Sequence, residues 1–183
     1  TINVDSITAA NSTNIANTIS LDATDATSND GTVSFGTGGN DSVFAQALVV
    51  RADDGITVAA NLTSQTGGIS LDADVDTDGG TLNNTAGTII STNSNITITA
   101  SDVELSGGLN SGTANITITD SAGGGIGIGN GTIAGGLNID RTELGNLTAD
   151  DLTISSIGNV SIDAIEPNDS NNVTGVLTIA ANG

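Results

Sequence analysis

The chain of 183 residues has no cysteine, histidine, tryptophan or tyrosine, and its only basic side chains are Arg51 and Arg141. Without cysteine, neither a disulfide framework nor a thiolate metal site is possible. The other absences remove most of the side chains that perform chemistry in enzymes. We therefore expect a structural protein rather than an enzyme.

Positive charge is scarce, because 21 acidic residues against two basic ones give a formal net charge of −19. Such a surface repels nucleic-acid phosphates and anionic lipid headgroups, so we expect no nucleic-acid partner. The sequence also lacks an apolar run of 18 residues, and we expect no membrane insertion. Divalent cations are the natural counter-charge, since they prefer carboxylate and carbonyl oxygen.

Aromatic side chains are limited to Phe35 and Phe44. A compact two-layer core normally depends on aromatic residues for buried area, whereas a narrow core of stacked Ile, Val and Leu does not. Disorder is the competing interpretation of a polar, acidic, glycine-rich chain. The mean hydropathy of +0.11 and the regular spacing of β-branched residues favour an ordered fold.

One short unit recurs along the chain: an aliphatic residue, a polar residue and a second aliphatic residue, separated from the next copy by turn-forming residues. The period of two is typical of a β-strand. Clear copies are Ile2-Asn3-Val4, Ile19-Ser20-Leu21, Ile56-Thr57-Val58, Ile69-Ser70-Leu71, Ile96-Thr97-Ile98, Ile116-Thr117-Ile118, Val160-Ser161-Ile162 and Leu177-Thr178-Ile179.

The copies recur at intervals that suit one turn of a solenoid. Residues 95–99 match residues 115–119 at an offset of 20, and Val33 to Ile56, Ile69 to Ile96 and Leu152 to Leu177 give offsets of 23, 27 and 25. In a solenoid, like residues stack on like residues in successive coils. The offsets therefore predict an all-β parallel β-helix (β-solenoid).

A β-sandwich or tandem Ig-like adhesin modules are the alternative architecture, because short strands at regular spacing also suit that class. Sandwich strands usually alternate over five to seven residues and include Trp or Tyr. Here the alternation covers about three positions before a turn residue intervenes, which favours the solenoid.

Several segments resemble the filamentous-haemagglutinin-like repeats of large bacterial surface proteins. Residues 68–74 are similar to the family's G-I-x-L-x-A turn, and residues 95–105 to its I-x-I-x-A-x-D-V-x-L pair; the stretch from Glu143 to Ile162 looks like a late repeat. The resemblance covers roughly residues 48–183 and less clearly 1–47. It implies a right-handed parallel β-helix, secretion and an adhesive or filamentous role, with no catalytic residue.

The sharpest chemical motif is acidic and comprises Asp72, Asp74, Asp76 and Asp78. From Asp74 it reads D-x-D-x-D-G, the first half of an EF-hand-type calcium loop. Crowded carboxylates repel one another unless a cation lies between them. The twelfth position is Thr85 rather than the bidentate glutamate. Calcium binding and a solvated acidic turn both remain open.

Three further patterns are weaker. The glycine-rich residues 123–131 lack the Lys-Ser/Thr of a phosphate loop and instead predict tight turns. Carboxylate pairs raise the question of a polysaccharide-degrading enzyme, but the aromatic platforms of sugar sites are missing. Residues 141–152 have the only weakly helical pattern, which Gly145 disfavours, and the segment after Pro167 predicts an exposed loop.

Both ends of the predicted stack present strand edges, which are adhesive unless covered. The interface residues would be Thr1, Ile2, Asn3 and Val4 at one end and Leu177, Thr178, Ile179 and Ala180 at the other. Their partners would be copies of the protein end to end or adjoining repeats of the same chain. We expect residues 1–183 to form a single solenoid segment of a longer protein or a polymerising subunit.

The predicted function is therefore mechanical. We expect a secreted or cell-surface stalk or filament-forming, adhesin-like solenoid that stacks end to end, with an acidic surface stabilised by calcium. The alternatives are a glycan- or matrix-binding adhesin module and, as a third class, a polysaccharide-degrading enzyme.

Overall fold

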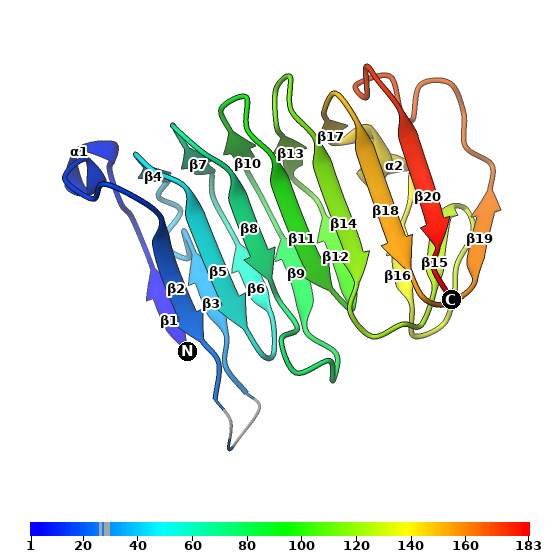
Figure 1. Ribbon diagram of the computed structural model, residues 1–183, viewed down its shortest axis with the longest axis horizontal. Coiled ribbons are helices and arrows are strands. Elements are labelled where there is room, and N and C mark those ends of the chain that lie inside the picture. The colour runs from blue at the N-terminus through cyan, green and yellow to red at the C-terminus, as the bar shows by residue number, and fades with distance from the viewer. Residues whose placement is uncertain (26, 28–29) are drawn as a thin grey trace.

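The computed structural model describes residues 1–25, 27 and 30–183, which form coils of short parallel strands stacked along one axis (Figure 1). Each regular coil passes through three sheets in turn. Sheet 1 contains β1 (Ile2–Val4), β3 (Val33–Phe35), β6 (Ile56–Val58), β9 (Thr81–Asn84) and β12 (Asp102–Leu105). Sheet 2 contains β4 (Ser42–Phe44), β7 (Leu62–Ser64), β10 (Thr88–Ser91), β13 (Gly108–Asn110) and β17 (Leu147–Thr148).

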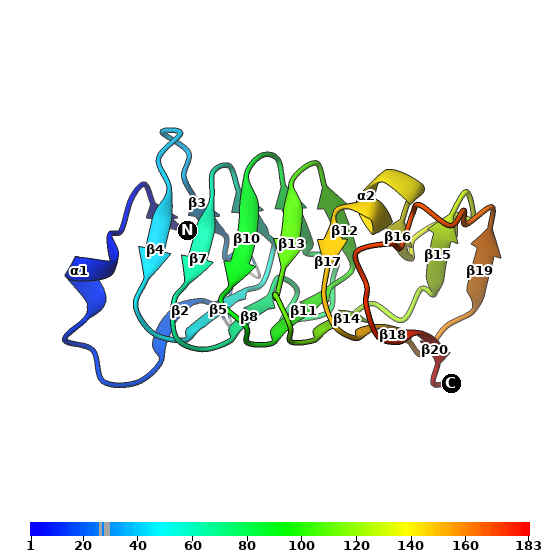
Figure 2. The same ribbon diagram turned by 90° about the horizontal axis from the view of Figure 1, so that it is seen from above.

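Sheet 3 is the longest and runs through the whole stack. It contains β2 (Ile19–Ala23), β5 (Leu48–Ala52), β8 (Ile69–Asp72), β11 (Ile96–Ala100), β14 (Ile116–Asp120), β18 (Leu152–Ser156) and β20 (Leu177–Ala181). With neighbouring strands about 4.8 Å apart, these seven strands span about 30 Å along the axis. Figure 2 shows sheets 2 and 3 as separate sides of the stack.

The coil is right-handed. In Figure 1 the chain descends the front through sheet 3, returns behind through sheets 1 and 2, and advances from left to right with each turn. The strand pairs of the described residues are parallel, from β1 with β3 to β18 with β20. The predicted parallel β-helix is confirmed, and the sandwich alternative is wrong because it requires facing antiparallel layers.

The registers follow the offsets read from the sequence. Ile96 pairs with Ile116, Val33 with Ile56, Ile69 with Ile96 and Leu152 with Leu177. All four predicted offsets therefore correspond to neighbouring coils. A shift of one residue would turn every aliphatic side chain outward, so the apolar pattern fixes the register.

The core is a column of aliphatic side chains. In sheet 3, Ile98, Ile118 and Ile154 stack in register and are fully buried. Burial of each such side chain stabilises the fold by about 1.5–3 kcal/mol. The two aromatic residues, Phe35 and Phe44, pack edge to face near the N-terminal end, with ring centroids 6.4 Å apart.

The coil between β14 and β17 is enlarged by one additional strand, because it contains two strands where a regular coil has one strand of sheet 1. Sheet 4 has the order β16 (Leu137–Ile139), β15 (Ile126–Gly129), β19 (Val160–Asp163), so β15 lies beyond β16 although it comes first in the chain. The return loop, residues 130–136, crosses directly over Gly127: a Cβ there would lie 2.5 Å from the Gly131 oxygen. The glycine-rich segment thus forms the tight turns that were predicted.

Two short helices replace strands or turns. α1 (Ala9–Ser12) packs beside β4, and the Ser12 Oγ accepts a hydrogen bond of 2.9 Å from the Ala45 N–H. α2 (Arg141–Gly145) begins with a capping box between Asp140 and Glu143. The weakly helical stretch 141–152 is therefore helical only over its first five residues. No helix in the described part of the chain is long and apolar enough to cross a membrane.

Candidate metal centre

The acidic loop joins β8 to β9 at the corner between sheets 3 and 1. Asp74, Asp76 and Asp78 each offer a carboxylate oxygen, and these oxygens lie within 4.8 Å of one another. Thr77 has a φ of 65°, a left-handed conformation that tightens the turn, and its N–H donates 3.3 Å to the Asp74 carbonyl. The tight turn brings alternate carboxylates of an extended sequence together.

Asp74 is the fixed member of the cluster and is 1% exposed. Its Oδ1 accepts hydrogen bonds of 3.0 Å from the backbone N–H groups of Asp78, Gly79 and Gly80. Its Oδ2 accepts a hydrogen bond from the Ser121 hydroxyl, two coils further along the stack. Asp74 therefore shapes the loop and ties it to sheet 3, while its Oδ2 keeps lone-pair capacity for a cation.

Asp76 is the member whose carboxylate is least compensated by the surrounding protein. Both of its carboxylate oxygens are shielded from solvent, and neither has a hydrogen-bond partner in the described structure. Burying an ionised carboxylate without a partner is strongly unfavourable. A divalent cation, which takes oxygen ligands, would supply the missing positive charge.

Asp78 completes the cluster on the solvent side. Its pKa is raised above the ordinary value, first by loss of solvation and then by the neighbouring Asp76 carboxylate, with smaller effects from Asp74 and Asp54. The local field is therefore strongly negative. A bound cation would reverse the repulsion among these carboxylates.

Asp72 lies outside the cluster. It belongs to β8 and stands in register with Arg51 on the neighbouring coil, while Arg51 also forms an ion pair with Asp22 at 3.6 Å. Burial raises the pKa of Asp72, and the Asp74 N–H and Arg51 partly offset this effect. Three of the four predicted ligands thus converge. The fourth, Asp72, is held in the extended strand β8 of sheet 3, before the loop turns.

The residue at the twelfth position of the motif does not contribute a ligand to the cluster in the described structure. Thr85 begins the turn after β9, and its N–H donates 2.9 Å to the Val58 carbonyl. The centre therefore shares only the first half of an EF-hand-type loop, which is what the sequence suggested.

A groove of about 360 Å³ adjoins the cluster. It is lined by Thr77, Asp78, Gly79, Ser101, Asp102, Ala122, Gly135, Gly136 and Asn138. Asp102 is half-buried, and its Oδ1 accepts 2.9 Å hydrogen bonds from the N–H groups of Val103 and Asn138. Burial nevertheless raises its pKa, and the Asp120 carboxylate adds to the effect. Sequence reasoning missed Asp102, because its partner Asn138 is 36 residues away.

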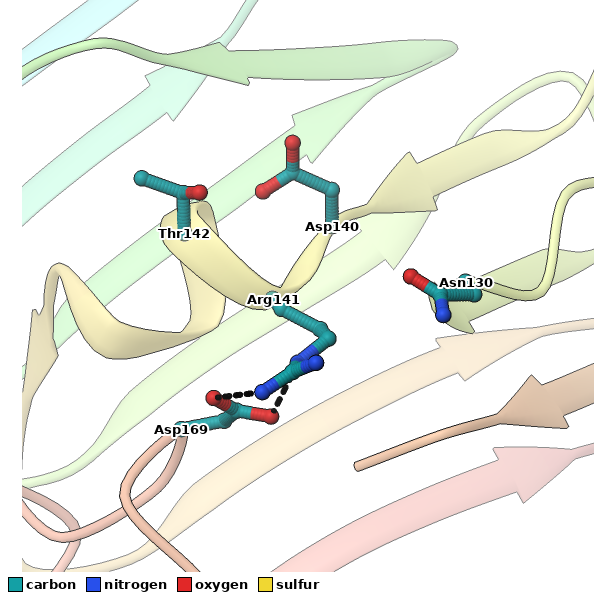
Figure 3. Close-up of a pocket in the computed structure, with 5 residues that line it drawn as sticks. All are labelled: Asn130, Asp140, Arg141, Thr142 and Asp169. Atoms are coloured by element: carbon teal, nitrogen blue, oxygen red, sulfur yellow. Dashed lines mark hydrogen bonds and ion pairs between the residues drawn. The ribbon is translucent and has the colours of Figure 1, made fainter. Parts of the chain in front are cut away.

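A second polar pocket, of about 410 Å³, lies between α2 and the loop after β19 (Figure 3). Arg141 donates from Nε to Asp169 Oδ2 at 2.8 Å and from Nη2 to Glu166 Oε2 at 2.7 Å. The guanidinium holds the pKa of Asp169 below its ordinary value. Arg141, one of the chain's two arginines, thus holds the loop around Pro167 against α2. The scarcity of arginine in the sequence was the signal that could have pointed to this residue.

The pocket's carboxylates are engaged in holding the fold. Asp140 accepts the Glu143 N–H as the helix cap, and Asp169 also accepts the Glu166 N–H at 2.7 Å. Glycoside hydrolysis needs one carboxyl whose pKa is raised so that it keeps a proton. The guanidinium has the opposite effect on the pKa of Asp169, so Asp169 is not suited to act as that acid.

No family model matches the chain, and neither the curated proteins nor the solved structures give a match.

Proposed function

We propose that this chain is a structural stalk segment of a secreted or cell-surface protein, stabilised by calcium at Asp74, Asp76 and Asp78. The observation that carries the proposal is the unbroken stack of seven strands in sheet 3, whose interior is filled by aliphatic residues. The buried carboxylates Asp74 and Asp120 bind backbone N–H groups of their own loops and a serine hydroxyl of another coil. The filamentous-haemagglutinin-like resemblance supports the same role in a bacterial surface protein.

The direction of the hydrogen bonds suits a load-bearing rod. In parallel coils the backbone hydrogen bonds run along the stack, and each interior strand is bonded to the coil before it and the coil after it. Repeat proteins of this kind depend on contacts between neighbouring units. The rod can therefore be lengthened by adding coils, without widening its core.

Calcium fits the acidic loop better than other common cations. Oxygen-only ligands suit calcium and magnesium, and calcium tolerates irregular geometry whereas magnesium requires a near-ideal octahedron. The cluster offers three carboxylates without a bidentate glutamate, which predicts weak binding. Extracellular calcium modules work at about 0.1–1 mM, so a weak site is compatible with secretion.

Single-molecule pulling tests the stalk role. With the chain held by residues 1 and 183, we expect stepwise release of coils, each adding about 70–130 Å for 20–36 residues. Millimolar calcium should raise the force of the step that contains the acidic loop. Smooth extension at low force, as for a disordered chain, would contradict the proposal.

Binding of the chain to an array of glycans and matrix proteins is the second test of the proposal. A structural stalk should give no saturable binding. A saturable, calcium-dependent signal with one glycan class would replace the stalk role with that of an adhesin module.

A further inference from the structure

The acidic loop contacts more of the stack than the two strands that it joins. The Val75 N–H donates 3.1 Å to the Ala52 carbonyl of the preceding coil. In the other direction, the Ser101 N–H and the Ser101 Oγ both donate to the Gly80 carbonyl at 2.9 Å. The loop therefore lies against the coil before it and the coil after it.

A third contact of the loop reaches one coil further. The Ser121 hydroxyl donates to Asp74 Oδ2, although β11 lies between β8 and β14 in sheet 3. The Ser121 N–H donates 3.0 Å to the Ala100 carbonyl, which holds the residue at the corner after β14. In Figure 1 the acidic loop and the chain that leaves β14 both lie along the lower edge of the stack. The hydroxyl thus links the cation site to the start of the glycine-rich segment.

The Ser121 bond fixes the oxygen of Asp74 that a cation would use. Oδ1 of Asp74 is occupied by three backbone N–H groups of its own loop, whereas the Ser121 hydroxyl is the one donor to Oδ2 in the described structure. A carboxylate oxygen can accept such a donor and still bind a cation. Groups that hydrogen-bond a metal-ligating carboxylate orient it, and their loss weakens metal binding by about 10–100-fold.

We propose that Ser121 is a positioning residue of the cation site, and that bound calcium in turn holds the corner after β14 against the acidic loop. This inference rests on the proposed calcium site and specifies how the stack responds to the ion. The two effects are linked: if the Ser121 bond strengthens calcium binding by a given factor, calcium strengthens that bond by the same factor. The ion then stabilises a contact with a coil that lies two positions beyond its own loop.

The corner that calcium would hold is the place where the enlarged coil begins. Three N–H groups of residues 122–125 donate to the Asp120 carboxylate, directly before Ser121 in the chain. Gly123 and Gly125 have φ values of 69° and 112°, which glycine adopts without strain but at a high entropic cost of ordering. The order of residues 121–125 should therefore depend on calcium.

Hydrogen–deuterium exchange of the 183-residue chain, in saturating calcium and in EGTA, tests the link. We expect calcium to slow amide exchange in residues 76–80, where the ion binds, and also in residues 121–125. Residues 177–181, at the far end of sheet 3, are the internal reference and should exchange equally in both conditions. Slowing at 76–80 without slowing at 121–125 would overturn the inference and leave the calcium site standing, whereas no slowing at either segment would overturn both.

Ser121→Ala removes the hydroxyl and should weaken calcium binding about tenfold in equilibrium dialysis. Calcium should then no longer slow exchange in residues 121–125. Ser121→Thr keeps a hydroxyl and should retain the wild-type affinity. Ser156→Ala is the matched control, because it removes an equivalent serine–carboxylate bond, to Asp120, outside the cation site. It should lower stability without changing the affinity for calcium.

A purely structural role for Ser121 predicts a different result. Ser121→Ala would then speed exchange in residues 121–125 equally in calcium and in EGTA, and the affinity for calcium would stay the same. Either that outcome or equal weakening of calcium binding by Ser156→Ala would contradict the proposal. The wild-type exchange comparison requires no substitution, so it decides the question even if Ser121→Ala does not fold.

Discussion

Ser156 donates a hydrogen bond of 2.6 Å from its Oγ to Oδ2 of Asp120 on the preceding coil. Asp120 is 6% exposed, and its two oxygens also accept the N–H groups of Ala122, Gly123 and Gly125. The carboxylate thus anchors the start of the glycine-rich segment to sheet 3. It takes a position that Ala100 fills one coil earlier.

Ser156→Ala removes one donor from this buried carboxylate. A hydrogen bond to a charged group contributes about 1.5–3 kcal/mol, so we expect a loss of that size in the free energy of unfolding. Ser155→Ala is the control, because Ser155 makes only a 3.4 Å contact with Thr119 and should change stability by less than about 0.5 kcal/mol. Equal losses in urea titrations of the two variants would contradict the anchoring role.

The sequence predicts the regular coils because their determinants are local. Ile96 and Ile116 each lie within an I-T-I-T unit bounded by turn formers. Stacking of identical residues in neighbouring coils then allows one register, in which Ile96 pairs with Ile116. The convergence of Asp74, Asp76 and Asp78 was accessible for the same reason, since alternate carboxylates precede a glycine within one loop.

The irregular part could not be predicted, because its determinants are distant in the sequence. The unit Ile126-Gly127-Ile128 would fit any strand position, and nothing local places β15 beyond β16. Asp102 pairs with Asn138 across 36 residues, and Arg141 pairs with Asp169 across 28. Such partners depend on which coil is enlarged, and the short repeat does not encode that.

Gly127→Ala should destabilise the enlarged coil. The new Cβ would meet the Asn138 Oδ1 and the Gly131 backbone oxygen at 2.4 and 2.5 Å, so the return loop must lift from β15. Overpacking of this kind costs about 1–3 kcal/mol. In Gly145→Ala, the nearest atom would be 3.9 Å away, and the helix position favours alanine by about 1 kcal/mol. Thermal unfolding of both variants distinguishes local crowding from a general effect of adding a methyl group.

The effect of Asp76→Asn on stability should change sign when calcium is added. In EGTA the variant should melt above the wild type, because it removes a buried carboxylate that lacks a partner. In calcium at 100 times the dissociation constant, the wild type should gain about 2.7 kcal/mol while the variant gains little. Glu104→Gln, which removes an exposed charge on β12, should respond to calcium like the wild type. A wild-type melting temperature that is the same in calcium and EGTA would rule out the metal centre.

Asp102→Asn should alter the dependence of stability on pH. Burial raises the pKa of Asp102 in the folded protein, so protonation favours the fold. The wild type therefore has this contribution in full below the unfolded pKa of about 3.9 and loses it as pH rises through the higher folded value. Asparagine keeps an Oδ1 that accepts the N–H groups of Val103 and Asn138, but it carries no charge.

We accordingly expect the variant and the wild type to be similar in stability near pH 3.5, with the variant increasingly more stable as pH rises toward 7. Urea unfolding at each pH in EGTA measures the difference, and Glu104→Gln provides the control for loss of one negative charge. A difference that stays constant with pH would mean that Asp102 has the same proton affinity in the folded and unfolded chains. The groove beside the acidic loop would then be better solvated than its lining indicates.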